Sequence, residues 1–133
     1  AGLERQLARF ARYGVPVLIT ENGLATTDEE QRLGFLRDHL RALAAAVAEG
    51  IPVAGYLYWS LMDNFEWTSG TAPRFGLAAT DFATQERTPR PAAAYFAEVC
   101  KANALPAPPP AGAGRKTARA APRDAGKSIS KRG

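Results

Sequence analysis

Residues 17–23 have the sequence VLITENG, a short uncharged run followed by Glu21, Asn22 and Gly23. Apolar side chains in this run do not alternate with polar ones, which predicts a strand buried on both faces, as in a parallel sheet. A second run of this kind, AGYLYW, occupies residues 54–59. A long helical pattern separates the two runs, and the order strand, helix, strand predicts an α/β fold with a parallel sheet.

The long helix is predicted over residues 27–50. It begins at a capping-box sequence, with Thr27 as the N-cap and Glu30 reaching back to it, and it ends at Gly50. Its apolar side chains recur at the helical period: Leu33, Leu36, Leu40, Leu43, Ala44 and Val47. One face of this helix is therefore expected to pack against the sheet.

Two further helices are predicted, over residues 3–13 and over residues 91–104, the second with Pro91 in its first turn. Residues 60–80 are predicted to form a loop, because glycines and a proline interrupt them. Two parallel strands alone leave much of a sheet uncovered. The sequence therefore predicts pairing with other strands, or a piece of a larger sheet.

Composition excludes several classes of protein. The chain has 133 residues, 46% of them hydrophobic, but no apolar run near the roughly 18 residues of a membrane span. Its single cysteine, Cys100, excludes a disulfide framework, and with the single histidine, His39, it argues against zinc-type sites. We expect Cys100 to be a small buried side chain and His39 to lie at the surface or between helices. We expect no metal and no cofactor.

The charge of the chain is uneven. Residues 106–133 carry seven Lys or Arg and one acidic residue, whereas residues 1–105 carry ten basic and twelve acidic residues. The C-terminal segment is rich in Pro and Ala and has no aromatic residue, so we predict a disordered basic tail. Without aromatic side chains for base stacking, a nucleic-acid partner is not expected.

Polar and aromatic residues gather where both predicted strands end. Glu21 follows the first strand, and Trp59, Glu66 and Trp67 follow the second. The carboxyl ends of parallel strands share one edge of a sheet, which is where α/β proteins place their sites. Flat rings beside carboxylates suit a sugar, whose C–H face stacks on indole. The alternative is a loop that only buries its aromatic side chains.

These residues fall in motifs that resemble glycoside hydrolase family 1, the family of β-glucosidases, β-galactosidases and 6-phospho-β-glycosidases. The matching motifs are VLITENGLA at 17–25, GYLYWSLMDNFEW at 55–67, RFGL at 74–77, Asp81, and TPRP at 88–91. The resemblance covers about residues 1–103. It implies a (β/α)8 barrel of which this chain is the C-terminal quarter, with strands seven and eight at residues 16–20 and 53–59.

The resemblance also implies a role for each site residue. Glu21 would be the catalytic nucleophile, and Trp59 would lie under the sugar. Glu66 would bind the 4- and 6-hydroxyls, Trp67 the 3-hydroxyl, and Phe75 would lie near C6. Glu66 and Trp67 together favour an unphosphorylated sugar such as glucose, galactose or fucose. The resemblance further implies a cis peptide between Trp59 and Ser60.

A retaining glycosidase needs two carboxyl groups about 5–5.5 Å apart. The family's acid/base lies in an Asn-Glu-Pro motif on the fourth strand, and this sequence contains no such tripeptide. We therefore expect part of a β-glucosidase-type retaining hydrolase that acts on a β-glycoside or oligosaccharide, with the N-terminal barrel portion as partner. The alternative is an inactive remnant or a partner-binding piece. We expect a cytoplasmic location, although the chain does not begin with Met.

Overall fold

The computed structural model describes residues 2–107. Its elements are α1 (Gly2–Ala11), β1 (Val17–Asn22), α2 (Glu29–Ala48), β2 (Val53–Tyr58), the 3-10 turn η1 (Trp67–Ser69), β3 (Ala78–Thr80), β4 (Arg87–Pro89) and α3 (Pro91–Ala102). The predicted strands and the three predicted helices are confirmed, with bounds shifted by at most two residues. The predicted basic tail lies outside the described residues from Pro108 onward.

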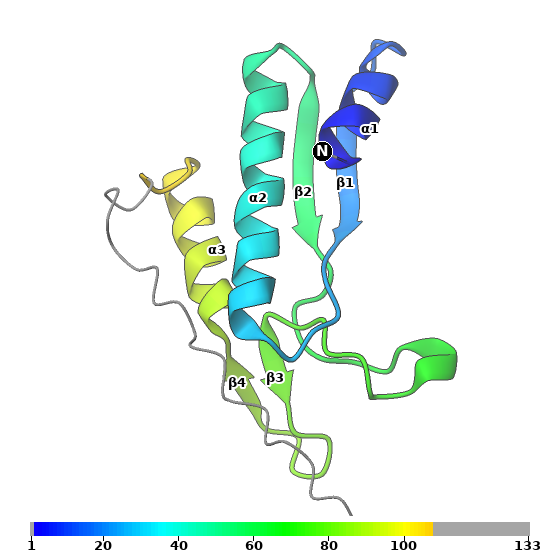
Figure 1. The fold of residues 1–133 in the computed structure, drawn as a ribbon, viewed down its shortest axis with the longest axis vertical. Helices are drawn as coiled ribbons and strands as arrows, with labels where there is room; N and C mark the ends of the chain where they lie inside the picture. The colour runs from blue at the N-terminus through cyan, green and yellow to red at the C-terminus, as the bar shows by residue number, and fades with distance from the viewer. Residues whose placement is uncertain (1, 108–133) are drawn as a thin grey trace, which may run out of the picture.

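The strands β1 and β2 form a parallel pair, joined by α2. Val17 pairs with Val53 at the start of the strands, and Asn22 pairs with Tyr58 at their end. Both arrows in Figure 1 point the same way, toward the long loop with η1 and the hairpin of β3 and β4. The loops that follow the two strands therefore share one end of the molecule.

The core lies between the sheet and helices α2 and α3. It contains Leu33, Leu36 and Leu40 of α2, Tyr58 of β2, Leu77 and Ala92. Tyr56 adds an edge-on aromatic contact with Phe96 of α3, at 5.9 Å between ring centroids. The apolar stripe predicted for α2 is thus confirmed for its first three leucines, whereas Ala44 and Val47 at its end are exposed.

The helix α2 begins one residue later than predicted, because Asp28 and not Thr27 is its N-cap. The Asp28 carboxylate accepts hydrogen bonds from the N–H groups of Glu30 and Gln31, at 3.0 and 3.1 Å. Aspartate caps a helix better than threonine and adds a negative charge where the helix dipole favours one. Thr26 supports the turn, since its hydroxyl accepts the N–H of Asp28 at 3.0 Å.

The hairpin of β3 and β4 was not predicted: residues 60–80, which include β3, were expected to form a loop, and no element was predicted over residues 81–90. Asp81 begins its turn, accepting the N–H groups of Ala83 at 2.8 Å and Thr84 at 3.1 Å. These hydrogen bonds lower the pKa of Asp81, with Thr84 contributing most. Strands of three residues are too short to show a period in the sequence.

Two single residues also bear on the sequence predictions. Cys100 is exposed, so the prediction that it is buried was wrong. It lies in the last turn of α3, where Lys101 and Ala102 are exposed as well. His39 is partly buried, with Nδ1 2.8 Å from the carbonyl oxygen of Phe35, and shares a groove with Leu3 of α1, as expected for an interhelical side chain.

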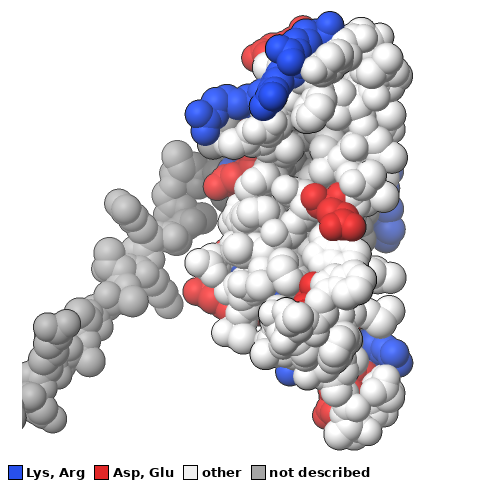
Figure 2. Space-filling model, turned by 90° about the vertical axis from the view of Figure 1, so that its right-hand side faces the viewer, with Lys and Arg blue, Asp and Glu red and all other residues white. Residues whose placement is uncertain are grey.

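Basic side chains on the side of the molecule formed by α1 and β1 are concentrated at one end. Figure 2 shows Lys and Arg gathered over the upper end of this side and a broad, mostly uncharged surface below. Phe10 of α1, Val15 before β1 and Leu18 of β1 are about half exposed, at 49, 56 and 51%.

Among residues 2–107 no helix combines the length and the apolar character needed to cross a membrane.

Candidate active site

The residues after β1 and β2 are in direct contact. The N–H of Trp59 donates to the carbonyl oxygen of Asn22 at 3.1 Å, which extends the strand pairing past Tyr58. Gly23 lies so close to Trp59 that a Cβ at this position would be 1.6 Å from the Trp59 carbonyl oxygen. The predicted nucleophile segment and the predicted sugar-binding segment therefore meet at one edge of the sheet.

A tyrosine of β2 holds the end of β1 from the side of the helices. The Tyr56 hydroxyl donates to the side-chain oxygen of Asn22 at 2.9 Å. Burial raises the pKa of Tyr56, with a further contribution from neighbouring Tyr58, so the hydroxyl keeps its proton and remains a donor. Asn22 is thereby fixed directly after Glu21.

Glu21 is exposed at the end of β1. Burial alternates along the strand up to this point, but Thr20 and Glu21 are exposed in succession, and the register shifts between Ile19 and Asn22. Irregular pairing of this kind turns a side chain away from its regular direction and is common beside active sites. The side chain of Glu21 makes no hydrogen bond or ion pair with another residue of the described range 2–107.

Trp59 and Glu66 form a pair within the second loop. The indole N–H of Trp59 donates to Glu66 Oε1 at 3.1 Å. The peptide between Trp59 and Ser60 is cis, which confirms that expectation. The loop closes at Glu66, whose N–H donates to the carbonyl oxygen of Gly70 at 2.7 Å. One carboxylate oxygen of Glu66 is thus held by the ring on which a sugar would stack.

The other two predicted sugar-binding residues lie differently. Trp67, at the start of η1, is 85% exposed and has a positive φ of 48°. Phe75 is half-buried in the returning part of the loop. The structure therefore brings Trp59 and Glu66 together. Trp67 directly follows Glu66 in the chain, but the Trp67 side chain is exposed to solvent.

The base of this loop is fixed by a buried ion pair that the sequence analysis did not identify. Asp63, 2% exposed, pairs through both oxygens with Arg90, at 2.9 and 2.8 Å. It also accepts the N–H of Gly76 at 2.9 Å. Burial alone would raise the pKa of Asp63, but the hydrogen bonds from Arg90 and Gly76 outweigh it and lower the pKa.

The partner of Asp63 is tied to α2 as well. Arg90 Nε lies 3.0 Å from Glu29 Oε1, and the hydrogen bond to Asp63 raises the pKa of Arg90. The partners of Asp63 lie 13 to 27 residues away in the chain. No periodicity in the sequence marks such a pairing, because its partners come from distant parts of the chain.

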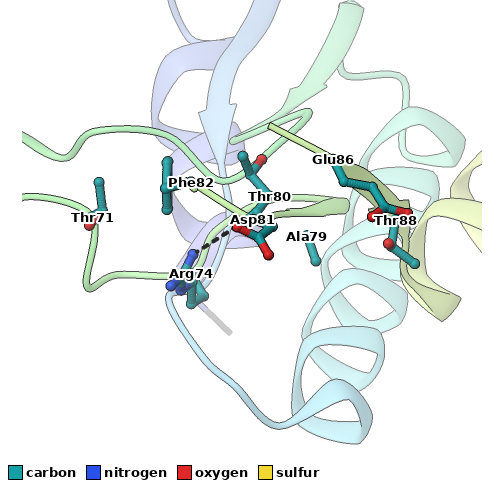
Figure 3. Close-up of a pocket in the computed structure, with 8 residues that line it drawn as sticks. All are labelled: Thr71, Arg74, Ala79, Thr80, Asp81, Phe82, Glu86 and Thr88. Carbon is teal, nitrogen blue, oxygen red and sulfur yellow. Dashed lines mark hydrogen bonds between the residues drawn. The ribbon is translucent and has the colours of Figure 1, made fainter. Parts of the chain in front are cut away.

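A cavity of about 670 Å³ lies beside the hairpin (Figure 3). It is lined by Thr71, Arg74, Ala79, Thr80, Asp81, Phe82, Glu86 and Thr88. Arg74 points across it to the carbonyl oxygen of Thr80, at 3.3 Å, and its guanidinium lies 5.1 Å from the centre of the Phe82 ring. Its one cation is therefore already engaged, and no predicted site residue lines this cavity.

Carboxylates and aromatic rings make up the strand-end region. Within residues 2–107, no three His, Cys, Asp or Glu side chains lie together in a way that could hold a metal ion. What the strand ends can offer a ligand is an exposed carboxylate at Glu21, an indole face at Trp59 and a second carboxylate at Glu66.

Solved structures resemble this fold closely. A β-glycosidase from Pyrococcus horikoshii matches with a TM-score of 0.78 and 43% sequence identity, covering 80% of this chain and 25% of its own. A family 1 β-glucosidase from Thermotoga maritima matches with a TM-score of 0.76 and 34% identity, covering 80% and 26%. The likeness supports the α/β fold of the TIM-barrel hydrolases.

Sequence comparison gives the same relationship. The β-galactosidase of Sulfolobus acidocaldarius is 42% identical over 100 residues, which are 75% of this chain and 20% of the relative. The β-glucosidase A of Thermotoga maritima is 38% identical over 103 residues, 70% of this chain and 23% of the relative. The chain thus spans about a fifth to a quarter of the relatives it matches. Residues 1–105 match the sequence profile of glycosyl hydrolase family 1, and the chain belongs to this family of TIM-barrel glycosidases.

Proposed function

We propose that this chain forms the seventh and eighth strand–helix units of a retaining β-glycosidase barrel, with Glu21 as the nucleophile. The observation that carries the proposal is the contact of Gly23 with the Trp59 backbone, which leaves no room for a Cβ. It holds the segment after β1 against the segment after β2. A carboxylate and a sugar-stacking indole then share the carboxyl end of one parallel sheet, where barrel enzymes carry out their chemistry.

The proposed substrate is a β-glycoside or β-linked oligosaccharide with an unphosphorylated sugar. Trp59 supplies the flat ring, and Glu66, held by the Trp59 indole at 3.1 Å, accepts from sugar hydroxyls. Trp67 and Phe75 complete the sugar site in this proposal. In this proposal the bound ligand covers the Trp67 ring, which is 85% exposed in the chain alone. The names of two relatives, a β-galactosidase and a β-glucosidase, agree with this substrate class.

The proposed reaction has two steps. Glu21 attacks the anomeric carbon while a carboxylic acid protonates the departing oxygen, and water then hydrolyses the glycosyl ester with the same group acting as base. Glu66 is engaged with Trp59 and with the sugar, so it does not serve as that acid. We place the acid/base on the N-terminal part of the barrel, outside these 133 residues.

The surface of the chain supports such a partner. Leu18 and Leu57 are 51 and 54% exposed on the two strands. Beside β1, a groove of about 440 Å³ is lined by Phe10, Tyr13, Val15, Pro16, Val17 and Leu18. Exposed apolar surface next to an unpaired strand edge is what a neighbouring strand and helix cover in a closed sheet. We propose that the N-terminal barrel portion covers it, and that the assembly is cytoplasmic.

The test uses a joined barrel, in which this chain follows the first three quarters of the Thermotoga maritima β-glucosidase A. We expect the joined barrel to hydrolyse an aryl β-glucoside, and Glu21→Gln to lower kcat by at least about 10³-fold. The chain alone should be inactive, because lost acid assistance by itself costs roughly 10²–10⁴-fold.

Two outcomes would count against this proposal. Full activity of the Glu21→Gln joined barrel would remove Glu21 from the chemistry. A correctly folded joined barrel without activity would favour the alternative, a catalytically inactive remnant that only binds a partner. Thr20→Ser is the matched control, since it alters the exposed neighbour of Glu21 without removing a carboxylate.

A further inference from the structure

The helix α2 carries an arginine whose side chain is completely buried. Arg32 has 0% of its side chain exposed and is the largest fully buried side chain of the described residues. Three backbone carbonyl oxygens accept from its guanidinium: Leu24 at 3.3 Å, Arg74 at 2.9 Å, and Thr26. These carbonyls belong to both loops of the candidate active site.

The two loops meet at this arginine. Leu24 and Thr26 lie in the segment that follows Glu21, and Arg74 lies in the returning part of the loop that carries Trp59 and Glu66. The carbonyl oxygen of Arg74 accepts from Arg32 and also from the N–H of Thr26, at 3.1 Å. Arg32 thus fixes the distance between the loops by hydrogen bonds to each of them.

A charged network extends this anchor. Glu29 lies 3.4 Å from Arg32 Nε through one oxygen and 3.0 Å from Arg90 Nε through the other. Arg90 in turn holds Asp63 at the base of the second loop, at 2.8 Å. Arg32 therefore belongs to a continuous chain of contacts that runs under both loops from α2.

The energetics favour a role beyond stability. Burying a guanidinium costs free energy of desolvation, and apolar side chains of similar volume at such positions are often neutral or stabilising. Arg32 precedes the core residues Leu33, Leu36 and Leu40 on the same helix. An apolar side chain at position 32 would therefore have extended the apolar face of α2. What the arginine adds is a planar fork of donors that can bind several carbonyls at once.

We propose that Arg32 is a positioning residue for the reaction, which sets Glu21 relative to Trp59 and Glu66 by locking the two loops together. The inference rests on the proposed function, because it takes these three residues to act on one sugar. Arg32 touches no reacting atom. Its effect arises because a misplacement of about 1 Å can cost 10²-fold in rate.

The first test measures loop geometry without catalysis. The indole N–H resonance of Trp59, assigned with Trp67→Phe, is recorded for the chain and for Arg32→Met. Arg32→Lys is a second variant that keeps the positive charge but not the planar fork of donors. It serves as the folded sample if Arg32→Met does not fold. Leu36→Ala, equally buried on α2 but in the core cluster, is the matched control for lost stability.

We expect the Trp59 resonance to move in both Arg32 variants and to stay in place in Leu36→Ala. In the joined barrel we expect Arg32→Lys to lower kcat by about 10²-fold, with a smaller change in KM, whereas Leu36→Ala keeps kcat near that of the parent. An unmoved Trp59 resonance, or equal kcat for Arg32→Lys and Leu36→Ala, would overturn the proposal. An active Glu21→Gln barrel would instead refute the proposed function, and the resonance test would remain decisive for Arg32.

Discussion

The indole nitrogen of Trp59 lies 3.1 Å from Glu66 Oε1, so the ring that would stack on a sugar also orients the carboxylate that would bind its hydroxyls. The two residues lie seven apart in the chain, and the backbone of Glu66 is held in addition by its N–H, which donates to the carbonyl oxygen of Gly70. The stacking surface and the hydrogen-bonding group are therefore placed as one unit. A change in either residue should affect the other.

We predict that Trp59→Phe in the joined barrel lowers kcat/KM by roughly 10–100-fold, because it removes the N–H that holds Glu66 and part of the stacking surface. The measurement is kinetics on an aryl β-glucoside. Phe65→Leu is the control, since Phe65 is 71% exposed in the same loop. A Trp59→Phe enzyme as active as the control would show that the pairing with Glu66 is dispensable.

Gly23→Ala should destabilise the fold by more than about 2 kcal/mol, since the new Cβ would meet the Trp59 carbonyl oxygen at 1.6 Å and separate the strand ends. Gly34→Ala is the matched control. It lies within α2 with nothing within 4 Å of its Cβ position, and should stabilise by roughly 0.5–1 kcal/mol. Urea unfolding of the parent, Gly23→Ala and Gly34→Ala measures the expected loss and the expected gain in unfolding free energy. An unchanged midpoint for Gly23→Ala would contradict the close contact.

Asp63→Asn should destabilise the chain by roughly 1–3 kcal/mol, because it removes the bidentate hydrogen bonds to the Arg90 guanidinium and leaves Glu29 as its remaining counter-charge. The Arg90 side chain is only 12% exposed. Asp38→Asn is the control, as that carboxylate is 75% exposed in a surface pair with Arg41. Equal urea midpoints for the two variants would mean that the buried pair contributes nothing.

The same pair gives the stability a pH dependence in the acid range. The folded state lowers the pKa of Asp63, so its contribution is complete above the unfolded value of about 3.9 and is lost as pH falls through the folded pKa. Asp81 contributes in the same direction. The difference in unfolding free energy between the parent chain and Asp63→Asn should therefore shrink below about pH 4. A difference that stays constant down to pH 2 would contradict a lowered pKa.

Asp28→Ala should cost about 1 kcal/mol of stability, because the carboxylate that caps α2 is lost, whereas Thr27→Ala should be nearly neutral. Unfolding midpoints of the two variants decide between these neighbouring residues. A larger loss of stability for Thr27→Ala than for Asp28→Ala would show that Thr27, and not Asp28, is the N-cap.

The sequence was sufficient for the features that depend on local pattern. Apolar runs identified β1 and β2, and the leucine period identified α2, because burial on a sheet or helix face leaves a repeat in the chain. The N-cap was displaced by one residue, since Thr27 and Asp28 are both acceptable caps and only the backbone decides.

Features that depend on distant partners could not be predicted. Arg32 falls beside the apolar period of α2 and resembles a surface residue in the sequence, yet it is fully buried. Its partners are backbone carbonyls, which no side-chain pattern reveals. The candidate site residues came from a family resemblance; their spacing alone supported only a group of polar and aromatic side chains at one sheet edge.

The most direct test of the central claim is mass spectrometry of the joined barrel after reaction with an activated 2-deoxy-2-fluoro-β-glucoside, which slows hydrolysis of a glycosyl ester. We expect one fluoroglucosyl group per protein, located by peptide mapping on Glu21, and no labelling of the Glu21→Gln variant. A stable adduct on Glu66 or on any other residue, with Glu21 unlabelled, would contradict it.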